Sequence, residues 1–187
     1  KDQYYFTDSE SRIMKGSDGF VQAYNAQAAV EGTFQLIVGQ TVTQDANDKK
    51  QLEPMVKTIK TQSGQKPDEL LADNGYCSDK NLGYIAGNSI DAYIATEKQK
   101  HGPKQENPKL GPLPPSATLV DRMRRKLQTR RGAAIYAARK SIVEPVFGQI
   151  KQGRGFRQFL LRGIEKVKSE WAVVCLTHNI LKMYRIC

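Results

Sequence analysis

Three carboxylates in this sequence occupy positions from which they could share metal ions. Asp8 follows a short β-prone run, Asp73 ends the run ELLAD directly before an Asn-Gly turn, and Glu144 lies in a late helical segment. Ligands of open α/β sheets gather where strands end. Oxygen ligands suit magnesium, and two such ions about 4 Å apart activate a water or hydroxyl and stabilise the leaving oxygen of a phosphodiester. We therefore take Asp8, Asp73 and Glu144 as candidate catalytic and metal-binding residues.

Each of these acids also has a purely structural interpretation. Asp8 could simply begin a turn, the Asp-Asn-Gly sequence at 73–75 suits ordinary turn chemistry, and Glu144 could be a surface residue beside Lys140. A fourth acidic position, Asn47-Asp48, precedes a predicted helix. Its context favours a helix N-cap over metal binding.

The helical spacing around Glu144 predicts a polar stripe. At 100° per residue, Tyr136, Lys140 and Lys151 all fall within about 80° of Glu144. A tyrosine, an acid and two cations on one face can serve a metal ion and a DNA phosphate at once. The alternative is a salt-bridged helix surface, in which each ion pair stabilises the helix by about 0.3 kcal/mol.

Basic residues predominate in the chain and flank Glu144. Its 187 residues include 29 Lys and Arg against 19 Asp and Glu, a net charge of +10. This excess suits a polyanionic partner, above all nucleic acid, and the alternative is a solvated basic face. The candidate DNA-binding residues are Tyr136, Arg139, Lys140, Lys151, Arg154, Arg157 and Arg162.

The elements that would position these residues follow from the hydrophobic pattern. Alternation between 22 and 43 predicts a β-hairpin, and Leu52, Val56 and Ile59 predict a helix that Gly64 ends. The expected remainder is a first strand at Tyr4–Phe6, a strand ending at Asp73, a short helix capped by Ser78, a strand near 91–98, a proline-rich loop at 99–117 and helices near 118–151 and 164–184. This order predicts one α/β domain over 1–187, with a mixed sheet covered by helices on both faces and 99–117 as a flexible insertion.

Composition excludes several classes of protein. No run of 18 apolar residues is present, so we expect no membrane span, and no signal peptide is evident. The three scattered cysteines fit reduced thiols in a cytoplasm. Cys175 and His178 have metal-ligand spacing without a second pair, which favours core residues. The chain begins at Lys1, so we expect an upstream part to be missing.

Three motifs together resemble a known family. YAARKSIVEPVFGQIK, residues 136–151, resembles the Y-R-E-K signature of DDE transposases from bacterial insertion sequences. LADNGY at 71–76 resembles the second-Asp motif of that group, and TDSESRIM at 7–14 resembles its first-Asp region. Flanking stretches are also similar, so the resemblance covers nearly the whole chain outside 99–117.

The resemblance implies a ribonuclease H-like catalytic core with Asp8, Asp73 and Glu144 as the triad. It implies Mg²⁺ or Mn²⁺ as cofactor, insertion-sequence ends and target DNA as partners, and a homodimer on DNA. It further implies cleavage and strand transfer in the bacterial cytoplasm, in association with the nucleoid, with an N-terminal DNA-binding part missing. Two alternatives stay open: an inactive DNA-binding fragment, and a metal-dependent nuclease of the same fold.

One spacing departs from the signature. The pattern requires three residues between Arg and Glu, but four separate Arg139 from Glu144, and Lys140 restores that gap only by breaking the preceding one. On a regular helix Arg139 points about 140° away from Glu144, and Lys140 only about 40°. The angles therefore favour Lys140 beside the metal site, with Arg139 secondary.

Overall fold

The strands pair two by two. The computed structural model describes residues 6–16, 19–97 and 111–186, and within them the order of pairing is β1-β2, β3-β4 and β5-β6. The first two pairs are antiparallel and the third is parallel. The bounds are β1 Arg12–Gly16, β2 Gly19–Ala23, β3 Asn25–Val30, β4 Ile37–Thr43, β5 Glu69–Ala72 and β6 Asp91–Ile94. The α/β class and the predicted hairpin within 22–43 are confirmed.

Helices occupy the rest of the described chain. Their bounds are η1 Asp48–Lys50, α1 Leu52–Ser63, η2 Asn74–Tyr76, α2 Asp79–Gly87, α3 Leu119–Gln128, α4 Arg130–Gly148, the π-helical turn η3 Gln149–Gly153, and α5 Ile164–Ile186. Gly64 ends α1 with a φ of 79°, and the Ser78 side chain caps α2 by accepting from the Asn81 N–H, both as predicted. Glycine tolerates this left-handed conformation because it has no Cβ.

The single helix predicted over 118–151 is wrong, because the chain breaks at Thr129. This residue has an extended backbone, and its hydroxyl accepts from the Gly132 N–H at 3.0 Å to begin α4. A Cβ on Gly132 would lie 2.0 Å from the Lys126 carbonyl oxygen, so only glycine fits this close junction. Threonine competes for backbone donors in this way, and the hydrophobic period alone does not show the interruption.

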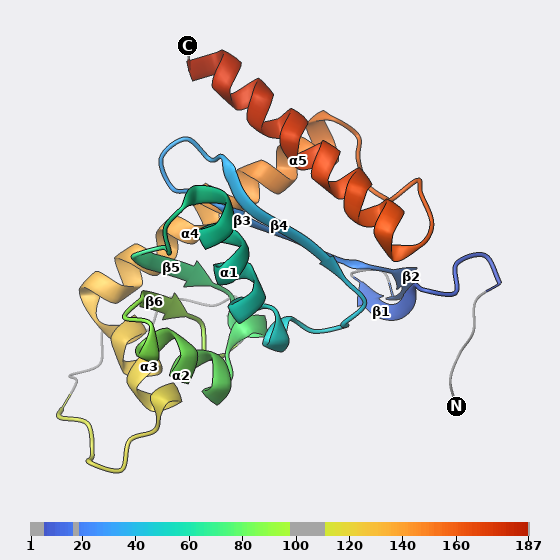
Figure 1. Cartoon of the computed structure of the whole chain (residues 1–187). Coiled ribbons are helices and arrows are strands. Elements are labelled where there is room, and N and C mark those ends of the chain that lie inside the picture. Colours follow the sequence, from blue (N-terminus) through green and yellow to red (C-terminus); the bar gives the residue numbers. More distant parts are fainter. Residues whose placement is uncertain (1–5, 17–18, 98–110, 187) are drawn as a thin grey trace.

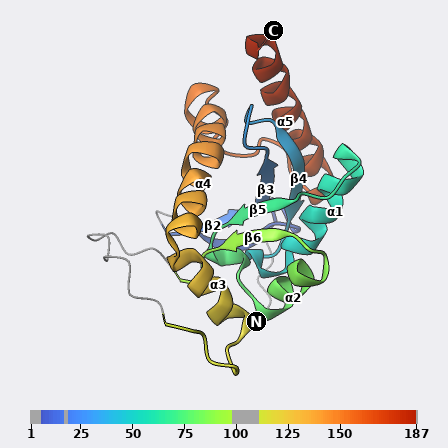
Figure 2. The same cartoon turned by 90° about the vertical axis from the view of Figure 1, so that its left-hand side faces the viewer.

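The helices cover the strands from both sides. Figure 1 shows α5 running across β3 and β4, and α1 packing beside β4. Figure 2, turned by 90°, shows α4 along one side of the strands and α1 and α2 on the other. None of the helices among the described residues has a stretch long and apolar enough to cross a membrane.

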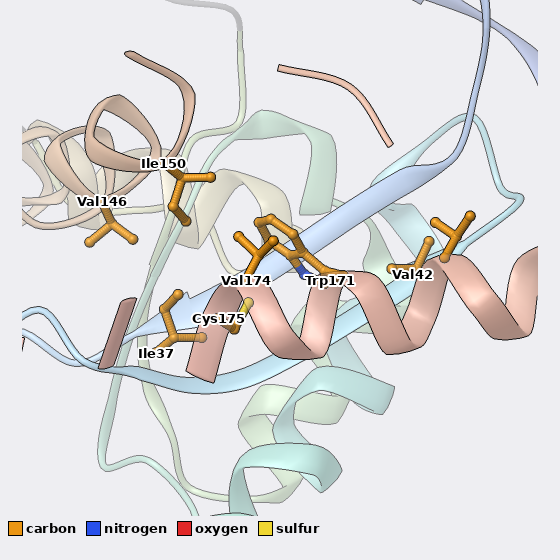
Figure 3. Packing of buried hydrophobic residues seen from close by; sticks show 8 residues of the cluster. Ile37, Val42, Val146, Ile150, Trp171, Val174 and Cys175 are labelled. Carbon is orange, nitrogen blue, oxygen red and sulfur yellow. The ribbon is translucent and has the colours of Figure 1, made fainter. Parts of the chain in front are cut away.

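Two hydrophobic clusters hold these layers together. The first joins α5 and the end of α4 to the β3–β4 hairpin (Figure 3), and its buried members are Ile37, Val42, Val146, Ile150, Val167, Trp171, Val174 and Cys175. The second joins α1, α2, β6 and α3, and its buried members are Leu52, Val56, Leu82, Ile85, Ile90, Ala92, Ile94 and Met123. Cys175 and His178 are both buried, as predicted for core residues.

The pairs do not join into one hydrogen-bonded sheet. Among the described residues β3 pairs only with β4 and β5 only with β6, and a cavity of about 520 Å³ lies between β3 and β5. We call it the first cavity; β3, β5, α1 and α4 line it. The predicted strand Tyr4–Phe6 lies outside the described residues except for Phe6, which is in a bend. The proline-rich loop at 99–117 is likewise described only from 111, where it forms neither helix nor strand.

Candidate active site

Asp73 lies at the carboxyl end of β5, where it opens the short helix η2. Its Oδ1 accepts from the Gly75 N–H at 2.8 Å, so the turn chemistry that the sequence suggested is present. The same residue lines the first cavity. A turn residue at the end of a parallel strand can therefore also face a ligand.

Asp48 is the carboxylate that the fold brings next to Asp73. A Cβ built on Gly75 would lie 2.8 Å from Asp48 Oδ2 and 3.0 Å from Asp73 Oδ1, so both oxygens approach the same point. The expected N-cap of this segment is Asn47, whose side chain accepts from the Lys49 N–H. Asp48 is thereby left to turn towards β3, where its Oδ1 accepts from Asn25 Nδ2 and from another β3 amide, each at 2.7 Å.

That second amide belongs to Gln27, a buried polar residue on β3. Only 4% of Gln27 is exposed, and its Nε2 donates to Asp48 Oδ1. Its Oε1 is buried and has no hydrogen-bond partner among the described residues. A buried amide oxygen without a partner costs free energy unless a ligand satisfies it. Asp48, Asp73 and Gln27 line the same cavity, and carboxylate and amide oxygens are the ligands that hard divalent cations prefer, so the chemistry of these residues fits a metal ion of that class.

The signature face of α4 meets the same cavity. Arg139 and Asp73 both line it, and the Arg139 guanidinium lies 5.8 Å from the centre of the Tyr136 ring. Burial, and then the nearby Asp73 charge, raise the pKa of Tyr136, although Arg139 opposes them. The end of the second-Asp motif and Arg139 of the signature helix therefore face the same cavity.

Arg139 and Lys140 lie in different surroundings. Arg139 Nη2 lies 4.0 Å from Glu144 Oε1, whereas Lys140 is exposed and does not line the first cavity. The helical angle gives only the direction in which a side chain leaves the helix, and the long, flexible arginine side chain can bend back along the helix surface. Glu144 itself has a side chain that is 60% exposed. It does not line the first cavity, although its partner Arg139 does.

Asp8 lies in a different environment. Both of its carboxylate oxygens accept from the Tyr24 hydroxyl at 2.8 Å, and Oδ2 also accepts from the Gly163 N–H, directly before α5. Desolvation raises the pKa of Asp8, but the hydrogen bonds from Tyr24 and Gly163 outweigh it and lower the pKa below its usual value. A carboxylate at the amino end of a helix is also stabilised by the exposed N–H groups.

A second cavity of about 830 Å³ opens beside Asp8. Lys151, Arg157 and Arg162 line it together with Asp8, and Asp48 lines both cavities. Lys151 is presented by the π-helical turn that follows α4, a local widening that frequently occurs at functional sites. Arg154 differs from its neighbours, because its guanidinium donates to the Val174 carbonyl at 3.0 Å and so ties the loop to α5.

Within the described residues, the three predicted triad carboxylates do not meet: only Asp73 lines the first cavity, and Asp8 lines the second. Asp73 faces the Tyr136–Arg139 side of α4, while Asp8 and Glu144 bind other partners. No three side chains of His, Cys, Asp and Glu converge as a metal-binding group within 6–16, 19–97 and 111–186. Sequence reasoning missed Gln27 entirely and took Asn47-Asp48 as the start of a helix and not as a metal site. The available signal was an acid directly after a capping asparagine, where a second cap is unnecessary.

Residues 4–180 match the family described as transposase DDE domain. No curated protein and no solved structure matched the chain significantly. Because the match extends over nearly the whole chain, from the first-Asp region to α5, the chain belongs to the family of transposase DDE domains.

Proposed function

We propose that this chain cleaves the ends of an insertion sequence and transfers the freed strand into target DNA. Asp8, Asp73 and Glu144 are the proposed catalytic triad. The observation that carries the proposal is the position of Asp73, at the end of β5 and opposite the Tyr136–Arg139 face of α4. The family match supports a transposase role independently.

The proposed cofactor is Mg²⁺ or Mn²⁺, held by the three triad carboxylates. When bound, such ions supply Lewis-acid stabilisation of a phosphodiester and a reactive water or hydroxyl. The chain's own residues place the DNA. Arg139 lies at the cavity wall, where a guanidinium can form a two-point contact with a phosphate. Tyr136 beside it can donate its hydroxyl hydrogen, because its raised pKa keeps it protonated.

A ribonuclease H-like sheet would require one more strand, and we propose that the segment around Asp8 supplies it. Among the described residues β3 and β5 each have one hydrogen-bonded neighbour, and their other edges line the first cavity. β1 pairs with β2 so that Arg12 is opposite Ala23. Continued in the same register, the ladder would place Asp8 opposite Gln27, beside Asp48 and Asp73. Residues directly opposite share one face of a sheet, so the triad's two aspartates would meet.

Disulfide trapping tests this arrangement. In a chain whose native cysteines are replaced by alanine, the variant Thr7→Cys with Ala28→Cys should form a disulfide on oxidation in the presence of Mg²⁺ and DNA. Thr7→Cys with Ala29→Cys is the matched control, because successive residues of a strand point to opposite faces. Equal trapping of both pairs, or trapping of the control alone, would contradict the proposed register.

The proposed DNA surface is the basic rim of the second cavity, together with Lys140 and Arg154. Lys151, Arg157 and Arg162 line that cavity. Phosphate contacts release counterions, so each lost contact weakens binding and reduces the salt slope by about 1. We therefore expect Arg157→Ala or Arg162→Ala to weaken binding to all DNA sequences. A homodimer on DNA and a location at the nucleoid are part of the same proposal.

A cleavage and joining assay tests the function. With insertion-sequence end DNA and Mg²⁺ or Mn²⁺, the parent chain should nick and join strands, while Asp73→Asn and Glu144→Gln should lose about three orders of magnitude in rate, as expected when a site loses a group that stabilises the transition state. Asp79→Asn, an exposed acid in the first turn of α2, is the control and should retain the parental rate. Parental activity in either site variant would refute the site assignment.

A DNA-binding domain without turnover is the second candidate. The observation that favours it is the separation of Asp8 and Glu144 from Asp73, each with a partner of its own. This candidate predicts salt-dependent DNA binding with no nicking at any metal concentration. A metal-dependent nuclease would instead nick DNA without joining strands.

A further inference from the structure

We propose that Asp48 and the side-chain oxygen of Gln27 bind the same divalent cation as Asp73. This inference rests on the proposed function, because it extends the ligand set of that site. It adds two residues that belong to neither the triad nor the signature helix.

The first step is the orientation of Asp48. Asn47 caps η1, so the Asp48 carboxylate is free to turn towards β3. Its Oδ1 takes both amide hydrogen bonds from β3, at 2.7 Å each, which leaves Oδ2 as the oxygen at Gly75. Asp73 Oδ1 reaches the same glycine, and the absence of a side chain there lets both carboxylates approach.

The second step is the buried amide of Gln27. Its Nε2 faces Asp48, and because the acceptor is a carboxylate, the nitrogen and oxygen of this amide cannot be interchanged. The remaining Oε1 is buried and has no partner among the described residues, although Gln27 lines the first cavity with Asp48 and Asp73. An amide oxygen in this position is a neutral ligand that completes a carboxylate pair.

The third step is the charge of the cavity. Arg139 is the one basic residue among the described residues that line it. The acids that line it are Glu31, Asp48, Asp68, Glu69 and Asp73. Burial, and then the charges of Asp48 and Asp73, raise the pKa of Tyr76 on the same wall. This negative field attracts a cation, and an all-oxygen ligand set favours Mg²⁺ or Mn²⁺ over Zn²⁺.

Direct binding of Mn²⁺ to the full chain tests the inference without DNA. Free Mn²⁺ is measured by electron paramagnetic resonance during titration, and thermal melts confirm that each variant is folded. Asp48→Asn keeps the side-chain shape and should raise the Mn²⁺ dissociation constant about tenfold or more. Gln27→Met should raise it less, because a neutral ligand is lost. Asp79→Asn removes the same charge from an exposed position and should bind as the parent does.

A shared ion also predicts how strongly a double variant binds Mn²⁺. In the double variant Asp48→Asn with Asp73→Asn, the loss of affinity should be smaller than the product of the two single losses, because one site is removed only once. Parental Mn²⁺ affinity in Asp48→Asn, or no Mn²⁺ binding by the parent, would overturn the inference.

The outcomes separate the inference from the proposed function. If Asp73→Asn abolishes cleavage while Asp48→Asn leaves Mn²⁺ affinity and cleavage unchanged, the inference fails and the function stands. If the parent binds Mn²⁺ through Asp48 but neither nicks nor joins DNA, the function fails and the cation site stands.

Discussion

Replacing Gly75 by alanine measures how tightly the two carboxylates at the end of β5 are held. Residue 75 is not among the glycines with positive φ, so alanine can adopt its backbone conformation. The added Cβ would lie 2.8 Å from Asp48 Oδ2 and 3.0 Å from Asp73 Oδ1. The effect of the substitution must therefore come from these contacts and not from backbone strain.

The size of the effect follows from the anchoring of Asp48. An ordinary contact begins at 3.4 Å, so the Asp48 carboxylate must retreat by several tenths of an ångström. That movement stretches the two 2.7 Å hydrogen bonds from Asn25 and Gln27. A hydrogen bond to a charged group contributes about 1.5–3 kcal/mol, and partial loss of two of them should lower the free energy of unfolding by about 1–2 kcal/mol.

Urea denaturation of a double-mutant cycle is the assay. Gly75→Ala is compared in the parent and in the Asp48→Ala background, with EDTA present so that no metal ion contributes. Without the Asp48 carboxylate, Gly75→Ala should lower the free energy of unfolding by less than about 0.5 kcal/mol. The coupling free energy between residues 48 and 75 should therefore be about 1 kcal/mol. An equal cost in both backgrounds would show that the carboxylate does not occupy the position described and would refute the reasoning.

Three further predictions concern the supports of the site. Gly132→Ala should lower the free energy of unfolding by about 3 kcal/mol, because its Cβ would lie 2.0 Å from a backbone carbonyl oxygen. Gly83→Ala in α2 is the control: open space surrounds that position, so this variant should melt at the parental temperature. Tyr24→Phe should lower the free energy of unfolding by about 1 kcal/mol at pH 7. Because hydrogen bonds lower the pKa of Asp8 in the folded state, this difference should disappear as the pH falls from 3.8 through the lower folded-state pKa, and urea titrations at a series of pH values will check this. Asn179→Ala should cost about 2 kcal/mol in urea titrations, because this side chain both donates to and accepts from the backbone of β4 at 2.8 Å; an unchanged midpoint would contradict that role.

Local patterns predicted most elements because their causes lie within a few residues. The alternation in 22–43 requires only neighbouring residues to define a half-buried hairpin, and Ser78 and Gly64 act on their own helices. The break at Thr129 was not predictable from hydrophobic period. It depends on a backbone approach at Gly132 that only the packed pair of helices reveals.

The sequence by itself determined the types of chemical group available: carboxylates near strand ends, a helix that carries Tyr136 and Glu144, and basic residues on both sides of Glu144 in the chain. Only the tertiary structure decided which groups meet. It placed Asp48 beside Asp73, and it paired Glu144 with Arg139 where the helical angles favoured Lys140. The physical reason is that spacing along one helix gives directions for that helix alone. Contacts between η1, β3 and the end of β5 depend on how separate elements pack and on how far flexible side chains reach.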